Sequence, residues 1–302
     1  MWLFNRIQLL KFSVLLLLSL SLISCEAINY YAQAARGQLV IMLGRENIQN
    51  LLANENLSNE LEHTFIEVNK IKQFAESELG LPLGENYSTY VDVNREYVVW
   101  NVFAAPEFST DPLNWCYPIA GCVSYRGYFS EASALRYAGK LEEKGLDVYV
   151  GGVAAYSTLG WFEDSLLSTV ISRSSNQIAR LIFHELAHQI IYVPGDTAFN
   201  ESFATAVERE GMRRWLEVTE QTNMIDVEEK NLNRHQQFVE LIISYRDKFT
   251  ALYKEEVADQ IKRQRKLELQ TALRNEFANI EKKWGDYGSY GVWFSHALNN
   301  AQ

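Results

Sequence analysis

The feature that most constrains this chain is the pattern H-E-x-x-H at His184-Glu185-Leu186-Ala187-His188, inside an apolar run that predicts a helix. Residues four apart lie on one face of a helix, so His184 and His188 should point the same way, one turn apart. Two imidazoles in that arrangement can hold one zinc ion, and Glu185 beside them can reach a water bound to the metal. The chain has only five histidines, so a zinc-binding helix is a better interpretation than an ordinary helix that carries two histidines.

A third zinc ligand is predicted on the next helix, because catalytic zinc usually has three protein ligands and a water. The first helix should begin at a cap in residues 174–176 and run to about Ile191, after which Pro194-Gly195-Asp196 turns the chain into a second helix. Glu201, near the start of that second helix, is the predicted third ligand. Two alternatives stay open: Glu201 only stabilises the helix N-terminus through the helix dipole, or Asp196 takes the ligand position.

Other residues of a peptidase site are less constrained by the sequence. Glu208 lies two turns after Glu201 on the same face, which predicts a contact with a ligand histidine. A peptidase that acts at a free N-terminus would also need an acid that holds the free amine of the substrate. The candidates, which the sequence does not rank, are Glu163, Asp164, Asp196 and Glu208. The sequence does not decide which tyrosine stabilises the oxyanion. The candidates are Tyr156, Tyr192 and a tyrosine of the loop 285–291.

A strand predicted over residues 146–156 precedes the histidine helix. In H-E-x-x-H peptidases, a strand in this position commonly binds the substrate backbone as an added strand. Its glycines, Gly151 and Gly152, would let another backbone approach closely. We therefore predict that Ala154 and Tyr156 contact the substrate or the transition state. The alternative is an internal strand that does not contact the substrate.

The N-terminus, residues 1–24, has the layout of a signal peptide, with Arg6 and Lys11 before an apolar core at residues 12–20. Its end, Leu22-Ile23-Ser24-Cys25, resembles a bacterial lipobox, which predicts a lipid anchor on Cys25 and a protein that faces the periplasm. Glu26 after the cysteine favours the outer membrane. The alternative, a transmembrane anchor, needs a longer apolar stretch.

The cysteine spacing and the net charge limit which other bonds and partners the chain can have. Cys116 and Cys122, six positions apart around a proline and a glycine, predict a disulfide in an exported protein. The alternative is a metal-binding pair, but no second pair lies nearby to complete such a site. The formal net charge of −10 argues against nucleic acid as a partner.

The predicted fold class is α+β and mostly helical, with a zincin-like catalytic core flanked by long helices. We expect one domain over residues 25–302, in three parts. Residues 26–85 should form helices over 27–53 and 58–79. Residues 86–217 form the catalytic core, with two strands of one small sheet at 87–93 and 97–104, a helix capped by Ser130 that extends to residue 144, and the two ligand-bearing helices. Residues 218–302 are helical, with two long helices within 227–284 whose apolar stripes include Phe238, Leu267 and Phe277.

Three stretches carry a resemblance to a known family: residues 115–129 (WCYPIAGCVSYRGYF), 155–162 (AYSTLGWF) and 183–204, from FHELAHQ to FNESFA. Together they resemble the bacterial predicted aminopeptidases, which are exported zinc-type proteins of Gram-negative bacteria. The resemblance covers roughly residues 26–300 and implies a gluzincin-like metallopeptidase. Ser165 stands where the family pattern has a proline, outside the metal site. The resemblance also implies a C-terminus that runs beyond Gln302.

The predicted function is therefore zinc-dependent hydrolysis of peptide bonds in the periplasm, as an aminopeptidase with one Zn²⁺ and with Glu185 activating a zinc-bound water. The expected partners are a peptide substrate and a membrane, the latter through the lipid on Cys25. The alternative is a catalytically inactive zinc-binding envelope lipoprotein that holds a partner protein. A scaffold lipoprotein without metal is a further alternative.

Overall fold

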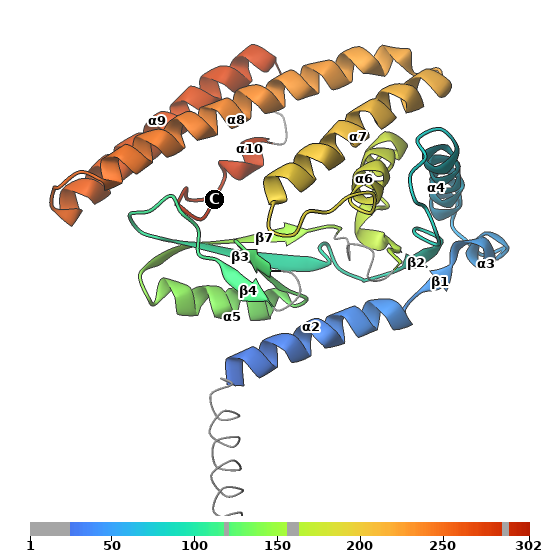
Figure 1. Ribbon diagram of the computed structural model, residues 1–302, viewed down its shortest axis with the longest axis horizontal. Coiled ribbons are helices and arrows are strands. Elements are labelled where there is room, and N and C mark those ends of the chain that lie inside the picture. Colours follow the sequence, from blue (N-terminus) through green and yellow to red (C-terminus); the bar gives the residue numbers. More distant parts are fainter. Residues whose placement is uncertain (1–24, 118–120, 156–162, 286–289) are drawn as a thin grey trace, which may run out of the picture. The chain divides into compact units, whose positions relative to one another are not determined.

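The computed structural model describes residues 25–117, 121–155, 163–285 and 290–302 (Figure 1). The chain forms two compact units, residues 1–45 and 46–302. The fold is α+β with 58% helix, which confirms the predicted class. The candidate metal ligands all lie in the second unit.

The first unit is described by a single helix, α2 (Cys25–Leu43). No helix in the described part of the chain is long and apolar enough to cross a membrane. The predicted signal peptide, residues 1–24, lies outside the described residues, so the lipid anchor stays a prediction.

The helix predicted over 27–53 is wrong in its second half. The chain leaves the helix after Leu43 and starts a separate short helix, α3 (Ile48–Leu52), because Asn47 accepts hydrogen bonds from the backbone N–H groups of Gln49 and Asn50.

Three helices build the main core of the second unit. Helix α4 (Asn59–Ser77) begins at Ser58, whose hydroxyl caps the N–H of Leu61, and confirms the helix predicted over 58–79. It packs against α6 (Ser175–Ala187), which in turn packs against α7 (Thr197–Val218). Phe74 of α4 lies 5.8 Å from Phe183 and 5.2 Å from Trp215, measured between ring centroids. Aromatic rings from all three helices therefore close this core.

The described strands include two separate three-stranded sheets. One has the order β1 (Glu46–Asn47), β2 (Thr89–Val91), β8 (Leu166–Leu167), and the other has the order β6 (Arg126–Tyr128), β3 (Val99–Pro106), β7 (Leu146–Val153). The prediction that residues 87–93 and 97–104 share one sheet is wrong. Between them, Asn94 has a φ of 49°, and the Arg95 guanidinium donates to the carbonyls of Val98 and Phe129. This turn directs β3 toward β6 and β7 instead of β2.

A disulfide joins Cys116 and Cys122, as predicted, across a hairpin of β4 (Trp115–Tyr117) and β5 (Gly121–Val123) in which the two cysteines are register partners. Helix α5 (Glu131–Glu142) follows and packs against β3 and β7. Ser130 stands at its N-cap position, but its side chain makes no capping hydrogen bond.

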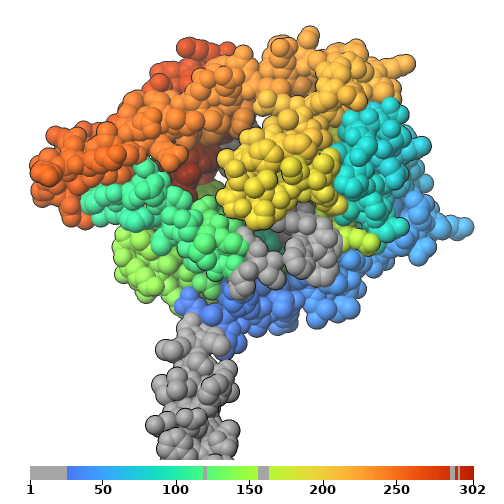
Figure 2. Space-filling view, in the orientation of Figure 1, coloured from blue at the N-terminus to red at the C-terminus, as the bar shows by residue number. Residues whose placement is uncertain are grey.

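The C-terminal part consists of two long helices, α8 (Ile225–Tyr253) and α9 (Asp259–Trp284), and a short helix α10 (Tyr290–Trp293). The prediction of two long helices is confirmed, and Phe238 and Phe277 belong to their shared core. Leu267 was wrongly predicted to face inward, because it is 63% exposed. Its neighbour Lys266 takes the inward position and donates to Asp147 at 2.5 Å. Figure 2 shows this orange helical pair beside α7, which lies at the surface in yellow.

Candidate metal centre

The helix that carries the histidine pair is fixed at both ends. Ser174 and Gln177 form a capping box at the start of α6, in which each side chain accepts from the backbone N–H of the other. The helix ends at Ala187 rather than at the predicted Ile191. His188 is its C-cap and keeps helical dihedral angles, with φ −61° and ψ −20°. His184 and His188 therefore still share one face, and their ring centroids lie 5.0 Å apart.

The turn after His188 places the third candidate ligand. Asp196 caps α7 by accepting a hydrogen bond from the N–H of Phe199 at 3.0 Å, so the alternative in which Asp196 is a ligand is not supported. Asn200 is 2% exposed, and its side chain bonds both backbone groups of Val193, accepting at 2.8 Å and donating at 2.9 Å. This amide ties the turn to the first turn of α7. Glu201, the next residue, is thereby held over α6.

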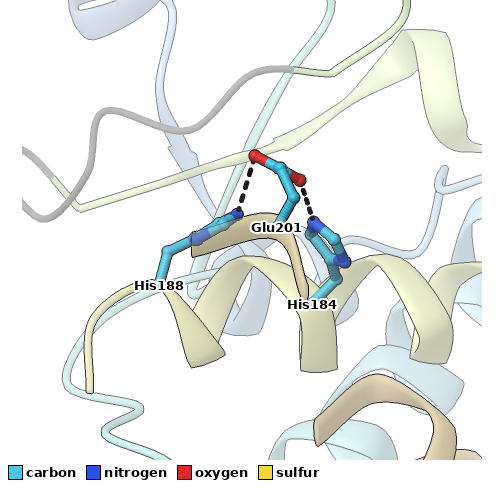
Figure 3. Close-up of side chains that lie close together, drawn as sticks. All are labelled: His184, His188 and Glu201. Carbon is cyan, nitrogen blue, oxygen red and sulfur yellow. Dashed lines mark hydrogen bonds and ion pairs between the residues drawn. The ribbon is translucent and has the colours of Figure 1, made fainter. Parts of the chain in front are cut away.

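Glu201 reaches both histidines (Figure 3). One carboxylate oxygen, Oε2, lies 3.2 Å from Nε2 of His184, and the other, Oε1, lies 3.7 Å from Nε2 of His188. One ligand atom of each of the three residues lies within 4.8 Å of the others. The side chain of Glu201 is 56% exposed, whereas those of His184 and His188 are 21% and 7% exposed. The group is thus closed on the α6 side and open on the Glu201 side.

The donor set fits one small divalent metal ion. Two histidines and one glutamate are a ligand set of catalytic zinc, and ligands about 2.0–2.1 Å from a tetrahedral ion are spaced by roughly 3.3 Å. Oε2 of Glu201 lies close to that spacing from Nε2 of His184, at 3.2 Å, and the other oxygen, Oε1, lies 3.7 Å from Nε2 of His188. A histidine that binds metal through Nε2 carries its proton on Nδ1 and needs an acceptor there. His184 has one in Glu208, whereas Nδ1 of His188 is buried without a hydrogen-bond partner among the described residues.

Glu208 makes the contact predicted for it. Its Oε2 lies 3.0 Å from Nδ1 of His184, and its Oε1 accepts from Arg180. Burial would raise the pKa of Glu208, but the hydrogen bonds from His184 and Arg180 outweigh burial and lower it. The hydrogen bond to Glu208 raises the pKa of His184 above 6.5, whereas burial lowers the pKa of His188. The two histidines therefore differ in their affinity for protons.

Glu185 borders a small pocket whose polar lining residues also include Tyr87, Asp164 and Ser165. Tyr87 is 5% exposed and has a φ of 56°, a left-handed conformation that is rare for a bulky residue. Its N–H donates to the carbonyl of Asp164 at 2.6 Å. Burial, followed by the negative charges of Glu185 and Asp164, raises the pKa of Tyr87 well above its usual value. The Tyr87 hydroxyl therefore stays protonated.

Sequence reasoning missed Tyr87, and nothing in the local pattern would have found it. Its position depends on the preceding Asn86, which is 6% exposed. The Asn86 side chain accepts from the N–H of Asp164 at 2.8 Å and donates to Gln189 at 3.3 Å. Residues far apart in the chain thus bring Tyr87 to α6, and no periodicity encodes such contacts.

The predicted substrate strand corresponds to β7. Among the described strands, β7 pairs only with β3, so it lies at the edge of its sheet. Ala154 follows the end of β7, and its carbonyl accepts a hydrogen bond from the Thr169 hydroxyl. Tyr156 lies outside the described residues, so its contact with the substrate stays a prediction. Of the other candidate tyrosines, Tyr192 is 42% exposed. The hydroxyl of Tyr290 lies 2.9 Å from Nδ1 of His235.

The four acids proposed for the substrate amine differ in their surroundings. Glu208 bonds His184 and Arg180, and Asp196 caps α7. Glu163 is exposed, whereas Asp164 is 8% exposed and lines the pocket of Glu185. Asp164 is therefore the one of the four that the structure brings to Glu185.

A family model described as "Putative aminopeptidase" matches residues 29–302. No curated protein and no solved structure matches the chain. The matched region contains all three residues of the candidate metal group.

Proposed function

The chain belongs to the family described as "Putative aminopeptidase", and from that membership we propose that it is a zinc-dependent peptidase, and specifically an aminopeptidase. The observation that carries this proposal is the group of His184, His188 and Glu201, with Glu185 next to the first histidine. Family membership supports the peptidase class. The metal, the reaction steps and the location are our proposals.

His184, His188 and Glu201 would hold the ion through two imidazole nitrogens and one carboxylate. A bound zinc ion would supply Lewis-acid chemistry, polarising the scissile carbonyl and making water more acidic. Glu185 acts as general base: its carboxylate takes a proton from the attacking water and then gives it to the nitrogen of the leaving amine. Tyr87 lines the same pocket as Glu185, and we propose its protonated hydroxyl as a hydrogen-bond donor in the reaction.

Asp164 is the acid that we assign to the free amine of the substrate. It lines the pocket of Glu185. An anion at this place would favour peptides with a free N-terminus over internal peptide bonds. β7, as an edge strand, would bind the extended substrate backbone by strand addition.

The location follows from the sequence of the N-terminus. We propose a lipid anchor on Cys25 and a site that faces the periplasm from the outer membrane. The disulfide between Cys116 and Cys122 supports an exported protein, because disulfides persist in oxidising compartments. Radiolabelled palmitate incorporated into the wild type and not into Cys25→Ser would support the anchor, and equal labelling of both would refute it.

The proposed function is tested by measuring metal content and peptide hydrolysis on the same purified protein. We expect one zinc per chain and hydrolysis of fluorogenic aminoacyl substrates, with little cleavage of internally quenched peptides whose N-terminus is blocked. Zinc at one per chain without any hydrolysis would support the inactive envelope protein instead. A chain that binds no zinc would refute the metal site altogether.

A further inference from the structure

Arg180 lies one helical turn before His184 on α6, and its guanidinium contacts two other helices. One nitrogen, Nη1, pairs with Oε1 of Glu208 on α7, and the other, Nη2, pairs with Oε2 of Glu228 on α8. The three side chains are 31%, 13% and 22% exposed, in the order Arg180, Glu208, Glu228. We call these three residues the Arg180 network. It lies where α6, α7 and α8 meet, next to the metal group.

The two carboxylate oxygens of Glu208 have different partners. Oε2 lies 3.0 Å from Nδ1 of His184, and Oε1 pairs with Arg180. The carboxylate cannot rotate without losing one of these contacts. Because Oε2 accepts at Nδ1, the His184 ring presents Nε2 to Glu201, at 3.2 Å. The orientation of this ligand therefore depends on Arg180 through Glu208.

The other histidine lacks such support. Nδ1 of His188 is buried and has no hydrogen-bond partner among the described residues. Its ring is held by packing, since the side chain is only 7% exposed. Of the two histidines, therefore, only His184 has a described hydrogen-bond partner at Nδ1 that fixes its ring orientation.

We infer that Arg180 is a positioning residue of the metal centre: it holds Glu208 so that His184 keeps its proton on Nδ1 and its Nε2 toward the metal position, and Glu228 extends this support to α8. The inference rests on the proposed function, because it assigns Arg180 a role in metal affinity. Outer partners of metal-binding histidines typically change metal affinity by 10–100-fold. A purely structural ion pair between helices would change stability and leave zinc affinity unaltered.

The test is zinc affinity, measured by competition with a chelator on the full chain. We expect Arg180→Gln to weaken zinc binding by about tenfold or more, and Arg180→Lys to restore part of the loss, because lysine keeps the charge but not the forked geometry. Glu228→Gln should have a smaller effect than Arg180→Gln, because Arg180 still contacts Glu208. Arg213→Gln is the matched control, since Arg213 pairs with Glu210 and Glu217 on the exposed face of α7. It should leave zinc affinity unchanged.

A double variant separates positioning from an independent structural effect. If Arg180 acts through Glu208, Arg180→Gln combined with Glu208→Gln should bind zinc no more weakly than Glu208→Gln. The inference would be overturned if the two losses of zinc affinity multiplied in the double variant. A zinc affinity of Arg180→Gln within twofold of the wild type would also overturn it. If Arg180→Gln does not fold, Arg180→Lys and Glu228→Gln decide, and wild-type affinity in both would likewise overturn it.

A second readout does not need the metal. The nitrogen chemical shifts of the imidazoles in the metal-free protein, above the pKa of His184, report which nitrogen carries the proton. We expect the Nδ1–H form of His184 in the wild type and a mixture of both forms in Arg180→Gln. Unchanged shifts would contradict the role of Arg180 even if the chain bound no zinc. Absence of zinc binding with the expected shifts would instead refute the proposed function.

Discussion

Nε2 of His184 and Oε2 of Glu201 lie 3.2 Å apart, although 17 positions separate the two residues in the chain. The short turn between α6 and α7 produces this proximity. Gly195 takes a left-handed φ of 84° in that turn, and Asn200 ties Val193 to the start of α7. The metal group is therefore a property of a helical hairpin, and its parts can be tested one by one.

Glu185→Gln should abolish hydrolysis and leave zinc bound. The amide cannot accept a proton from water, and loss of a general base costs typically 10²–10⁴-fold in rate. Turnover of a fluorogenic aminoacyl substrate and zinc content, measured on the same sample, check this. Glu210→Gln, on the exposed face of α7, is the control and should behave as the wild type. Full turnover in Glu185→Gln would disprove its role as the base.

Glu201→Gln should lose zinc, whereas Asp196→Asn should keep it. The neutral amide that replaces the Glu201 carboxylate is a poor zinc ligand, so we expect an affinity loss above about 100-fold, more than outer partners typically cause. Asparagine preserves the N-cap that Asp196 provides for α7, so this variant should stay folded. Competition with a chelator measures the zinc affinity of both variants. The opposite ranking would show that Asp196, and not Glu201, is the third ligand.

Asn200→Ala should lower the free energy of unfolding by about 1–3 kcal/mol, because it leaves the backbone N–H of Val193 without its partner and removes one of the two donors to the Val193 carbonyl, which still accepts from the N–H of Asp196. Urea denaturation of the metal-free protein measures this. Ser202→Ala is the control, since its hydroxyl only returns to the carbonyl of Ala198 within the same helix. We also expect Asn200→Ala to weaken zinc binding, because it loosens the turn before Glu201. A stable variant with wild-type zinc affinity would mean that the turn is held by other contacts.

Local patterns predicted the parts of this site that lie on single helices. The four-residue spacing of His184 and His188, the cap at Ser174 and the turn before Asp196 are all encoded by neighbouring residues. Contacts between distant segments were not predictable in the same way. β2 pairs in parallel with β8, with Tyr90 opposite Leu166, and this partnership has no local signal. Arg180 likewise reads as an ordinary helix-surface residue until Glu208 and Glu228 are brought beside it.

Zinc affinity should depend on pH through His184. Glu208 raises the pKa of this histidine above 6.5, and zinc needs the neutral imidazole, so protons should compete with zinc already above pH 6.5. Below the raised pKa, affinity should fall by about tenfold per pH unit. The pKa of His188 is lowered, so its protonation should set in only at lower pH. In Glu208→Gln the onset should move to lower pH. The same onset in both proteins would contradict this assignment.

The stability of the metal-free protein should change with pH in the opposite sense. A raised pKa means that the folded state favours protonated His184, so this contribution is complete below the unfolded pKa near 6.5. It is lost as the pH rises through the raised value. Thermal unfolding of the metal-free protein at several pH values measures it, with Glu208→Gln as the reference. A contribution that grows with pH in this range would show that Glu208 does not favour the charged imidazole.

Tyr87→Phe should lower turnover without changing zinc content. The left-handed φ of 56° at a buried tyrosine costs energy that the surrounding contacts must offset, and such strain concentrates at functional sites. Phenylalanine keeps the ring and the backbone conformation, so only the hydroxyl is removed. We expect a decrease in kcat/KM of about tenfold, the scale of one lost hydrogen bond of about 1.4 kcal/mol. Tyr90→Phe is the matched control. Tyr90, on the strand β2, is also buried, and its ring packs on Phe65 of α4. Equal kinetics in both variants would mean that the Tyr87 conformation serves folding and not hydrolysis.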